Sequence, residues 1–160
     1  MTSWQPSTDV NGLVQRAALL QRLRQFFAQR HVLEVQTPVL APNTVTDPDV
    51  ESIAVPGYGF LQTSPEYQMK RLLAAGAPSI YQLAPAFRHE EVGRLHNSEF
   101  TMLEWYRLDF DHNQLMDEVA DLVNEVLGPA SYTTVTYAEL VGELGRSRDE
   151  LDLAFAEASD

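Results

Sequence analysis

The sequence of 160 residues contains no cysteine, few basic residues and no long apolar run. The missing cysteine excludes disulfides, thiolate zinc sites and cysteine nucleophiles, and it favours a reducing, cytoplasmic environment. Because 11 Lys and Arg stand against 23 Asp and Glu, the formal charge is −12, which disfavours a basic surface for nucleic acid. No apolar stretch reaches the ~20 residues of a membrane-spanning helix, and no signal peptide is recognisable. We therefore expect one soluble, compact domain without a membrane partner.

The first part of the chain predicts a helix, a strand and a long connection. Apolar residues at helical spacing predict an amphipathic helix over 13–29, which Asp9 or Asn11 can cap. After His31 the apolar residues alternate, which predicts a strand ending at Thr37-Pro38. Residues 41–59 are rich in proline and glycine and predict an irregular connection of the kind that often carries function.

The rest of the chain predicts three strands and several helices. A short strand over 60–63 precedes a helix over 65–75, where Ser64 can accept a backbone N–H and Pro65 suits the first helical position. The other predicted elements are strands over 79–88 and 99–107, a helix over 113–127 with a core stripe of Leu115, Val119, Leu122 and Val126, and short helices over 137–145 and 148–158. This succession indicates an α+β fold with an antiparallel sheet flanked by helices.

The strands over 79–88 and 99–107 predict a hairpin that carries the chemistry. Alternation places Arg88 and Glu90 on one face of the first strand. On the second strand, the residues that share one face are Phe100, Met102, Glu104 and Tyr106. The same spacing also allows a purely structural sheet, in which Leu103 and Trp105 point inward and Glu104 lies in water.

The mixture of residue types on that face favours an adenylate-forming site. Arg88 can clamp a phosphate with its planar guanidinium, and Phe100 can stack on a base. The carboxylates can hold amines, and Arg94 and His96 on the loop can close on outer phosphates. Arg88 is the predicted catalytic residue, because it can neutralise charge on an α-phosphate under attack.

Three segments resemble motifs of the class II aminoacyl-tRNA synthetases. Residues 33–40 (LEVQTPVL), with the preceding helix, resemble their motif 1, and residues 87–106 resemble motif 2. Among these synthetases the lysyl subgroup fits best. Within it, residues 3–7 (SWQPS), 63–73 (TSPEYQMKRLL) and 101–107 (TMLEWYR) resemble the paralogues that modify elongation factor P. The resemblance implies a class II catalytic core that activates a lysine isomer, (R)-β-lysine, with ATP and transfers it to a lysine of elongation factor P.

The resemblance also implies a role for each matching residue. Arg88 contacts the α-phosphate, Glu90 the adenine amino group and His96 the outer phosphates. The remaining implied contacts are Phe100 stacked on adenine, Glu66 on the substrate's backbone-side amine, Glu104 and Tyr106 on its ε-ammonium, and Ser64 lining the same pocket. Mg²⁺ is expected with the full-length enzyme, but no metal ligand is assigned in these residues. Two positions depart from the pattern: His89 replaces the usual asparagine and Ser98 the usual proline, and we expect His89 to be structural or solvated.

Motif 3, with its second ATP-binding arginine, has no counterpart in residues 1–160. We therefore expect the chain to represent the N-terminal half of a catalytic domain, inactive alone, without an anticodon-binding domain. Motif 1 implies a homodimer, and the acidic balance makes tRNA a less favoured acceptor than a protein. Two alternatives stay open: a lysyl-tRNA synthetase core, and a non-catalytic dimerisation or regulatory module.

Overall fold

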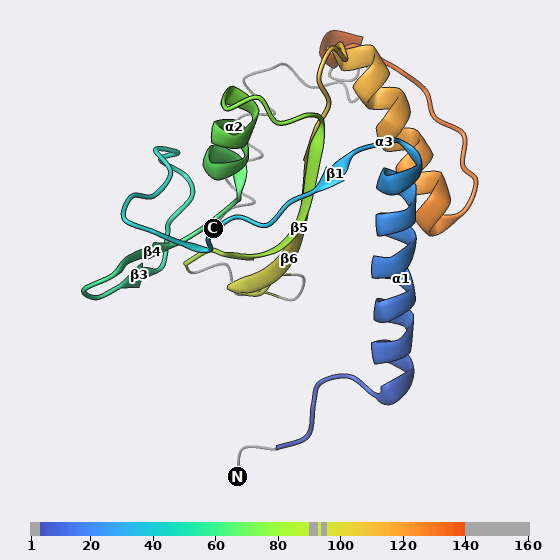
Figure 1. Cartoon of the computed structure of the whole chain (residues 1–160). Helices are drawn as coiled ribbons and strands as arrows, with labels where there is room; N and C mark the ends of the chain where they lie inside the picture. Colours follow the sequence, from blue (N-terminus) through green and yellow to red (C-terminus); the bar gives the residue numbers. More distant parts are fainter. Residues whose placement is uncertain (1–3, 90–92, 94–95, 140–160) are drawn as a thin grey trace. The chain divides into compact units, whose positions relative to one another are not determined.

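Figure 1 shows a computed structural model of the chain, which describes residues 4–89, 93 and 96–139. The chain divides into two compact units, Met1–Gly128 and Pro129–Asp160. The first unit holds the predicted hairpin and the residues that could form a site. None of the helices described is both long and apolar enough to cross a membrane.

The central sheet contains the predicted hairpin. Its strand order is β1 (Leu33–Glu34), β5 (Ile80–Phe87) and β6 (Glu99–Tyr106). β5 and β6 pair antiparallel along their whole length, from Ile80 opposite Tyr106 to Phe87 opposite Glu99. β1 pairs parallel with β5, so the α+β class is confirmed, while the sheet is mixed rather than purely antiparallel.

Pro85 lies inside β5 without breaking it. The N–H of Phe87 donates to Gln62 O at 2.9 Å, away from β6, whereas the N–H of Arg88 donates to Ser98 O at 3.0 Å, toward the hairpin partner. Backbone groups alternate along a strand, so the nitrogen of Pro85 also points away from β6. A proline there removes no bond from the hairpin, which explains why the strand continues through it.

A second, smaller sheet is formed by strands inside and at the two ends of the segment predicted to be irregular. It consists of β2 (Leu40–Ala41), β4 (Gly59–Leu61) and β3 (Ala54–Val55), in that order and antiparallel. Gly59 is required where β4 meets β2, because a Cβ there would lie 2.2 Å from the carbonyl oxygen of Ala41. The prediction for residues 41–59 is therefore right for the loop between β2 and β3 and wrong for β3, and its two ends, Ala41 and Gly59, belong to β2 and β4.

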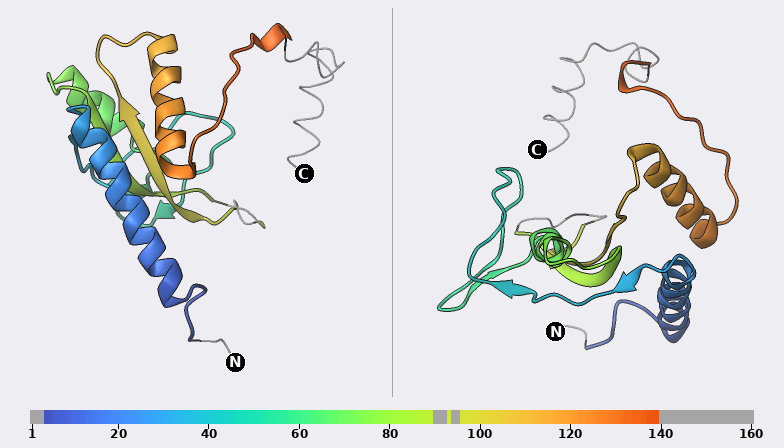
Figure 2. Two further views of the ribbon diagram at one scale, coloured as in Figure 1. Left: turned by 90° about the vertical axis from the view of Figure 1, so that its right-hand side faces the viewer. Right: turned by 45° about the horizontal axis from the view of Figure 1, so that its top comes forward.

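The hydrophobic core lies on one face of the hairpin, under α1 (Val10–Gln29) and α3 (His112–Leu127) (Figure 2). Asp9 caps α1, as predicted, by accepting the N–H of Gly12 at 2.8 Å. The buried core residues are Leu23, Phe26, Phe27, Val32, Tyr81 and Leu122, and Leu103 and Trp105 of β6 pack against them.

The predicted core stripe of α3 is wrong at two of its four positions. Leu115 and Val119 are exposed, whereas Leu122 is buried and Val126 packs against the core. The inner face of α3 instead carries Glu118, which is only 5% exposed. The helix therefore turns Glu118, rather than Leu115 and Val119, toward charged and polar groups beneath it.

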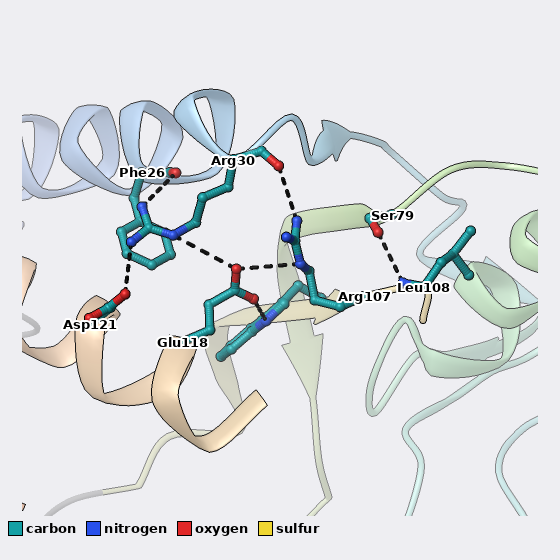
Figure 3. Close-up of polar contacts among 8 residues, drawn as sticks. Phe26, Arg30, Ser79, Arg107, Leu108, Glu118 and Asp121 are labelled. Atoms are coloured by element: carbon teal, nitrogen blue, oxygen red, sulfur yellow. Dashed lines mark hydrogen bonds and ion pairs between the residues drawn. The ribbon is translucent and has the colours of Figure 1, made fainter. Parts of the chain in front are cut away.

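Those partners form a buried network that joins α1, β6 and α3 (Figure 3). The indole N–H of Trp105 donates to Glu118 Oε2 at 3.0 Å, and the Nε atoms of Arg107 and Arg30 lie 3.4 and 3.8 Å from Glu118 Oε1. Arg107 also donates to the carbonyl oxygen of Arg30 at 3.1 Å, at the end of α1. The network holds the C-terminal end of β6 against α1 and α3.

In the second unit, the predicted capping box at Thr136 is present. Glu139 Oε2 accepts from the backbone N–H and the hydroxyl of Thr136 at 2.7 and 2.8 Å, and the N–H of Glu139 donates to Thr136 Oγ1 at 3.2 Å. Most of the predicted helix over 137–145, and all of the one over 148–158, lie outside the described residues.

Candidate functional site

One face of the hairpin packs on the hydrophobic core, and the other carries the predicted site residues. Leu103 and Trp105 point to the core, as expected if the sheet were purely structural. Glu104, however, is half-buried and not solvated as that alternative requires. The face opposite the core carries four cross-strand pairs: Ile80 with Tyr106, Gln82 with Glu104, Ala84 with Met102, and Ala86 with Phe100. Arg88 continues this face beyond the last pair. The predicted grouping of Arg88, Phe100, Glu104 and Tyr106 on one side is therefore confirmed.

That face borders a cavity of about 430 Å³. β6 contributes Met102 and Glu104, the end of β5 contributes Arg88, and the start of α2 (Glu66–Ala74) contributes Glu66. The other lining residues are Val45, Thr46, Asp47, Val50, Thr63, Ser64 and Tyr67. The 45–50 loop was not assigned to the site from the sequence, although its length and composition marked it as a candidate.

Helix α2 begins at Glu66, one residue after the predicted start, and Pro65 is its N-cap rather than its first helical residue. Ser64, just before this start, lies beside Glu104. The N–H of Glu66 donates to Ser64 Oγ at 3.0 Å, which is the predicted capping bond. The same hydroxyl donates to Glu104 Oε2 at 2.7 Å. Ser64 thus serves the helix start and the cavity at once.

Glu104 is held from its other side by Tyr106. The phenol donates to Glu104 Oε1 at 2.6 Å. Burial, and then the hydrogen bond to Glu104, raise the pKa of Tyr106 well above its usual range, so the phenol stays protonated and remains a donor. Two hydroxyl groups therefore orient one carboxylate toward the cavity.

Glu66 has an internal counter-ion that the sequence reasoning missed. Lys70 Nζ, one turn further along α2, donates to Glu66 Oε1. This hydrogen bond, together with the charge of Glu66, raises the pKa of Lys70. The (i, i+4) spacing of Glu66 and Lys70 was the signal that could have identified the pair.

Arg88 lines the cavity, and Phe100 lies beside it on the same face of the hairpin. The guanidinium carbon lies 5.2 Å from the centroid of the Phe100 ring, which is a cation–π distance. The loop wall is held near α2, because Thr46 Oγ1 and the Tyr67 hydroxyl lie 3.0 Å apart. The arrangement offers a cation and a ring at one end and carboxylates at the other.

Of the predicted ligands, Phe100, Tyr106 and His96 are not among the residues that line the cavity. His96 is exposed on the hairpin loop, where its backbone is hydrogen-bonded to Gly93. Glu90 and Arg94 lie outside the described residues. His89 Nδ1 lies 3.3 Å from Glu51 Oε2 and the side chain is partly exposed, in agreement with the expected structural or solvated histidine. Among the described residues there is no cluster of three or more side chains that could hold a metal ion.

Comparison with known sequences gives a consistent result. A profile of the tRNA synthetases class II (D, K and N) matches residues 7–154. A protein of Vibrio campbellii named elongation factor P–(R)-β-lysine ligase is 51% identical over 147 residues, which cover 86% of this chain and 46% of that protein.

Relatives of the same name have similar values. The protein of Vibrio vulnificus is 52% identical over 145 residues, covering 85% of this chain and 45% of the relative. That of Yersinia enterocolitica is 50% identical over 146 residues, covering 86% and 45%. The chain therefore spans about half the length of the curated relatives it matches.

Proposed function

This chain belongs to the class II tRNA synthetase (D, K and N) family. We propose that it carries the motif 1 and motif 2 part of an ATP-dependent ligase. The proposed substrates are a lysine isomer, (R)-β-lysine, and a lysine side chain of elongation factor P. The names of relatives about half identical to the chain support this choice of substrates.

The observation that carries the proposal is the oriented carboxylate of Glu104. Ser64 and Tyr106 both donate to it at the wall of the cavity, and Glu66 lines the same cavity. An ammonium group is the ligand that such a carboxylate favours, because a charge-assisted hydrogen bond is about twice as strong as a neutral one. A diamino acid can engage Glu104 with its side-chain ammonium and Glu66 with its other amine, displacing Lys70 from Glu66.

The opposite end of the site suits a nucleotide. Phe100 offers a ring on which adenine stacks, and Arg88 offers a planar guanidinium that matches the geometry of a phosphate. Glu90, Arg94 and His96 are proposed to complete the contacts with adenine and with the outer phosphates. Mg²⁺, when bound by the full-length enzyme, supplies further neutralisation of the phosphates.

In the proposed reaction, a carboxylate oxygen of the amino acid attacks the α-phosphorus of ATP, and pyrophosphate leaves. Arg88 stabilises the charge that accumulates on the α-phosphate oxygens during this step. The amine of the acceptor lysine then attacks the carbonyl carbon of the adenylate, an amide forms, and AMP leaves. The acceptor amine loses its proton in this second step.

The test uses the full-length protein that contains this chain, with ATP, lysine isomers, elongation factor P and tRNA. We expect the mass of elongation factor P to increase by one aminoacyl group and tRNA to stay unchanged. Glu104→Gln should abolish the gain, whereas Glu99→Gln, a matched exposed residue on the opposite face of β6, should not. Charging of tRNA alone would establish the synthetase alternative, and the absence of any transfer or adenylate would establish the non-catalytic module.

We also propose that the protein is a homodimer through α1 and motif 1. The first half of α1 exposes Val10, Leu13 and Val14 at 76, 54 and 61%, and Leu33 of β1 is 51% exposed. A second copy that covers these apolar side chains would remove them from water, which favours association.

A further inference from the structure

Gln82 is a buried polar residue that neither the fold nor the proposed contacts explain. It lies in β5 directly opposite Glu104 of β6, on the face that carries the site. Its side chain is 2% exposed, and Gln82 Oε1 has no hydrogen-bond partner among the residues that the structure describes. Buried polar atoms are nearly always paired, so an unpaired oxygen beside a substrate-facing carboxylate indicates a missing donor.

We propose that Gln82 Oε1 is an acceptor for the ammonium group of the bound substrate, alongside Glu104. The inference rests on the proposed function and extends it, because it adds a specificity-determining residue from the neighbouring strand. Residues directly opposite each other in an antiparallel pair have Cβ atoms about 5 Å apart. One ammonium nitrogen can therefore lie within hydrogen-bond reach of both side chains.

The donor count supports a further acceptor. An ammonium group has three N–H donors, and each oxygen of Glu104 already accepts one hydroxyl, from Ser64 or from Tyr106. The carboxylate can satisfy two of the three ammonium donors through its remaining lone pairs. The third donor needs a further acceptor close to Glu104. Besides the oxygen of Tyr106, Gln82 Oε1 is buried there without a partner among the described residues.

The residues that share a face of β5 with Gln82 offer no other hydrogen-bond acceptor in their side chains. On the same face of β5, the residues before and after it are Ile80, Ala84 and Ala86, all apolar and buried. A carboxamide accepts a hydrogen bond without adding a second negative charge next to Glu104. A carboxylate at this position would repel Glu104 in the absence of substrate and raise the pKa of one of the two groups.

The proposal predicts opposite effects on stability and on binding for Gln82→Met in the full-length protein. Methionine has a similar length and no acceptor, so the ligand-free protein should melt at a higher temperature, because a buried unpaired oxygen is removed. The KM for the lysine isomer in ATP–pyrophosphate exchange should rise by about 10-fold or more, since a hydrogen bond to a charged group is lost. The KM for ATP should stay within about twofold of its original value.

Two further variants serve as controls. Glu99→Gln alters an exposed residue on the opposite face of β6, and it should leave both KM values unchanged. Gln82→Glu keeps an acceptor, so the KM for the lysine isomer should remain within about threefold of the original, while the ligand-free protein melts at a lower temperature.

A lower melting temperature for Gln82→Met with an unchanged KM for the lysine isomer would overturn the inference and make Gln82 a structural residue. An equal rise in both KM values would also overturn it, because the loss would not be specific to the amine. If the unaltered full-length protein supports no exchange with any lysine isomer, the proposed function fails first and takes this inference with it. The unaltered protein and the variants thus test the two proposals separately.

Discussion

Replacing Glu118 tests whether the buried network under α3 holds the site strand in place. Glu118 is 5% exposed and faces three groups: the indole N–H of Trp105, Arg107 and Arg30. Glu118→Ala removes the shared acceptor and leaves Arg107, whose side chain is 13% exposed, with an uncompensated charge. The perturbation therefore removes a charge and leaves its partners buried.

The expected magnitude follows from this burial. Removing one partner of a buried ion pair costs about 3–5 kcal/mol, because the remaining charge stays desolvated. Glu118→Gln keeps an acceptor for Trp105 and should cost less, about 1–3 kcal/mol. The matched control is Asp121→Ala: Asp121 also pairs with Arg30, at 3.1 Å, but it is 61% exposed, so its loss should cost about 0–1 kcal/mol.

The assay is urea denaturation followed by circular dichroism, with the free energy of unfolding extrapolated to water. The reasoning predicts the order Glu118→Ala, Glu118→Gln, Asp121→Ala from most to least destabilised. Since a domain of this kind is stable by about 5–15 kcal/mol, the first variant should lose a large part of its stability. Equal losses for Glu118→Ala and Asp121→Ala would refute the view that burial decides the value of these pairs.

Three further predictions concern α1, α3 and the core. Burial, and then its hydrogen bond to Glu34, raise the pKa of Tyr81 to about 12, so the stability that Tyr81 contributes is complete below pH 10 and is lost as the pH rises from 10 to 12. Tyr81→Phe should reduce the alkaline loss of stability in pH-dependent melting curves, and the raised pKa of Tyr106 accounts for a part that remains. Asp111→Ala breaks the capping box with Gln114 and should cost about 1 kcal/mol in urea denaturation; an unchanged midpoint would contradict the cap's role. Leu13→Asp should convert the proposed dimer to a monomer in analytical ultracentrifugation without loss of helix content, because Leu13 is 54% exposed.

Much of the local structure could be predicted from the sequence, because its signals lie within one turn or one strand. Asp9 and Ser64 mark the starts of α1 and α2 through short-range hydrogen bonds. The strict alternation of a strand placed Phe100 and Glu104 on one face, and the register confirms this. The pair of Lys70 with Glu66 was also accessible in this way, since it depends only on helical spacing.

Other features were decided by contacts between distant segments. The spacing of apolar residues predicted that Leu115 and Val119 lie on the inner face of α3. In the structure both are exposed, and the inner face carries Glu118, which contacts Trp105 and Arg107. A carboxylate is normally costly to bury, and only its partners on other elements make that burial favourable.

The sequence by itself determined which side chains share a face of the hairpin, because the pleat of a strand is a property of its own backbone. Only the tertiary structure decided what that face meets: the 45–50 loop that lines the cavity, the hydroxyl of Ser64 on Glu104, and the unpaired oxygen of Gln82. These depend on which segments pack together, and packing is chosen by the burial and pairing of the whole unit rather than by any local pattern.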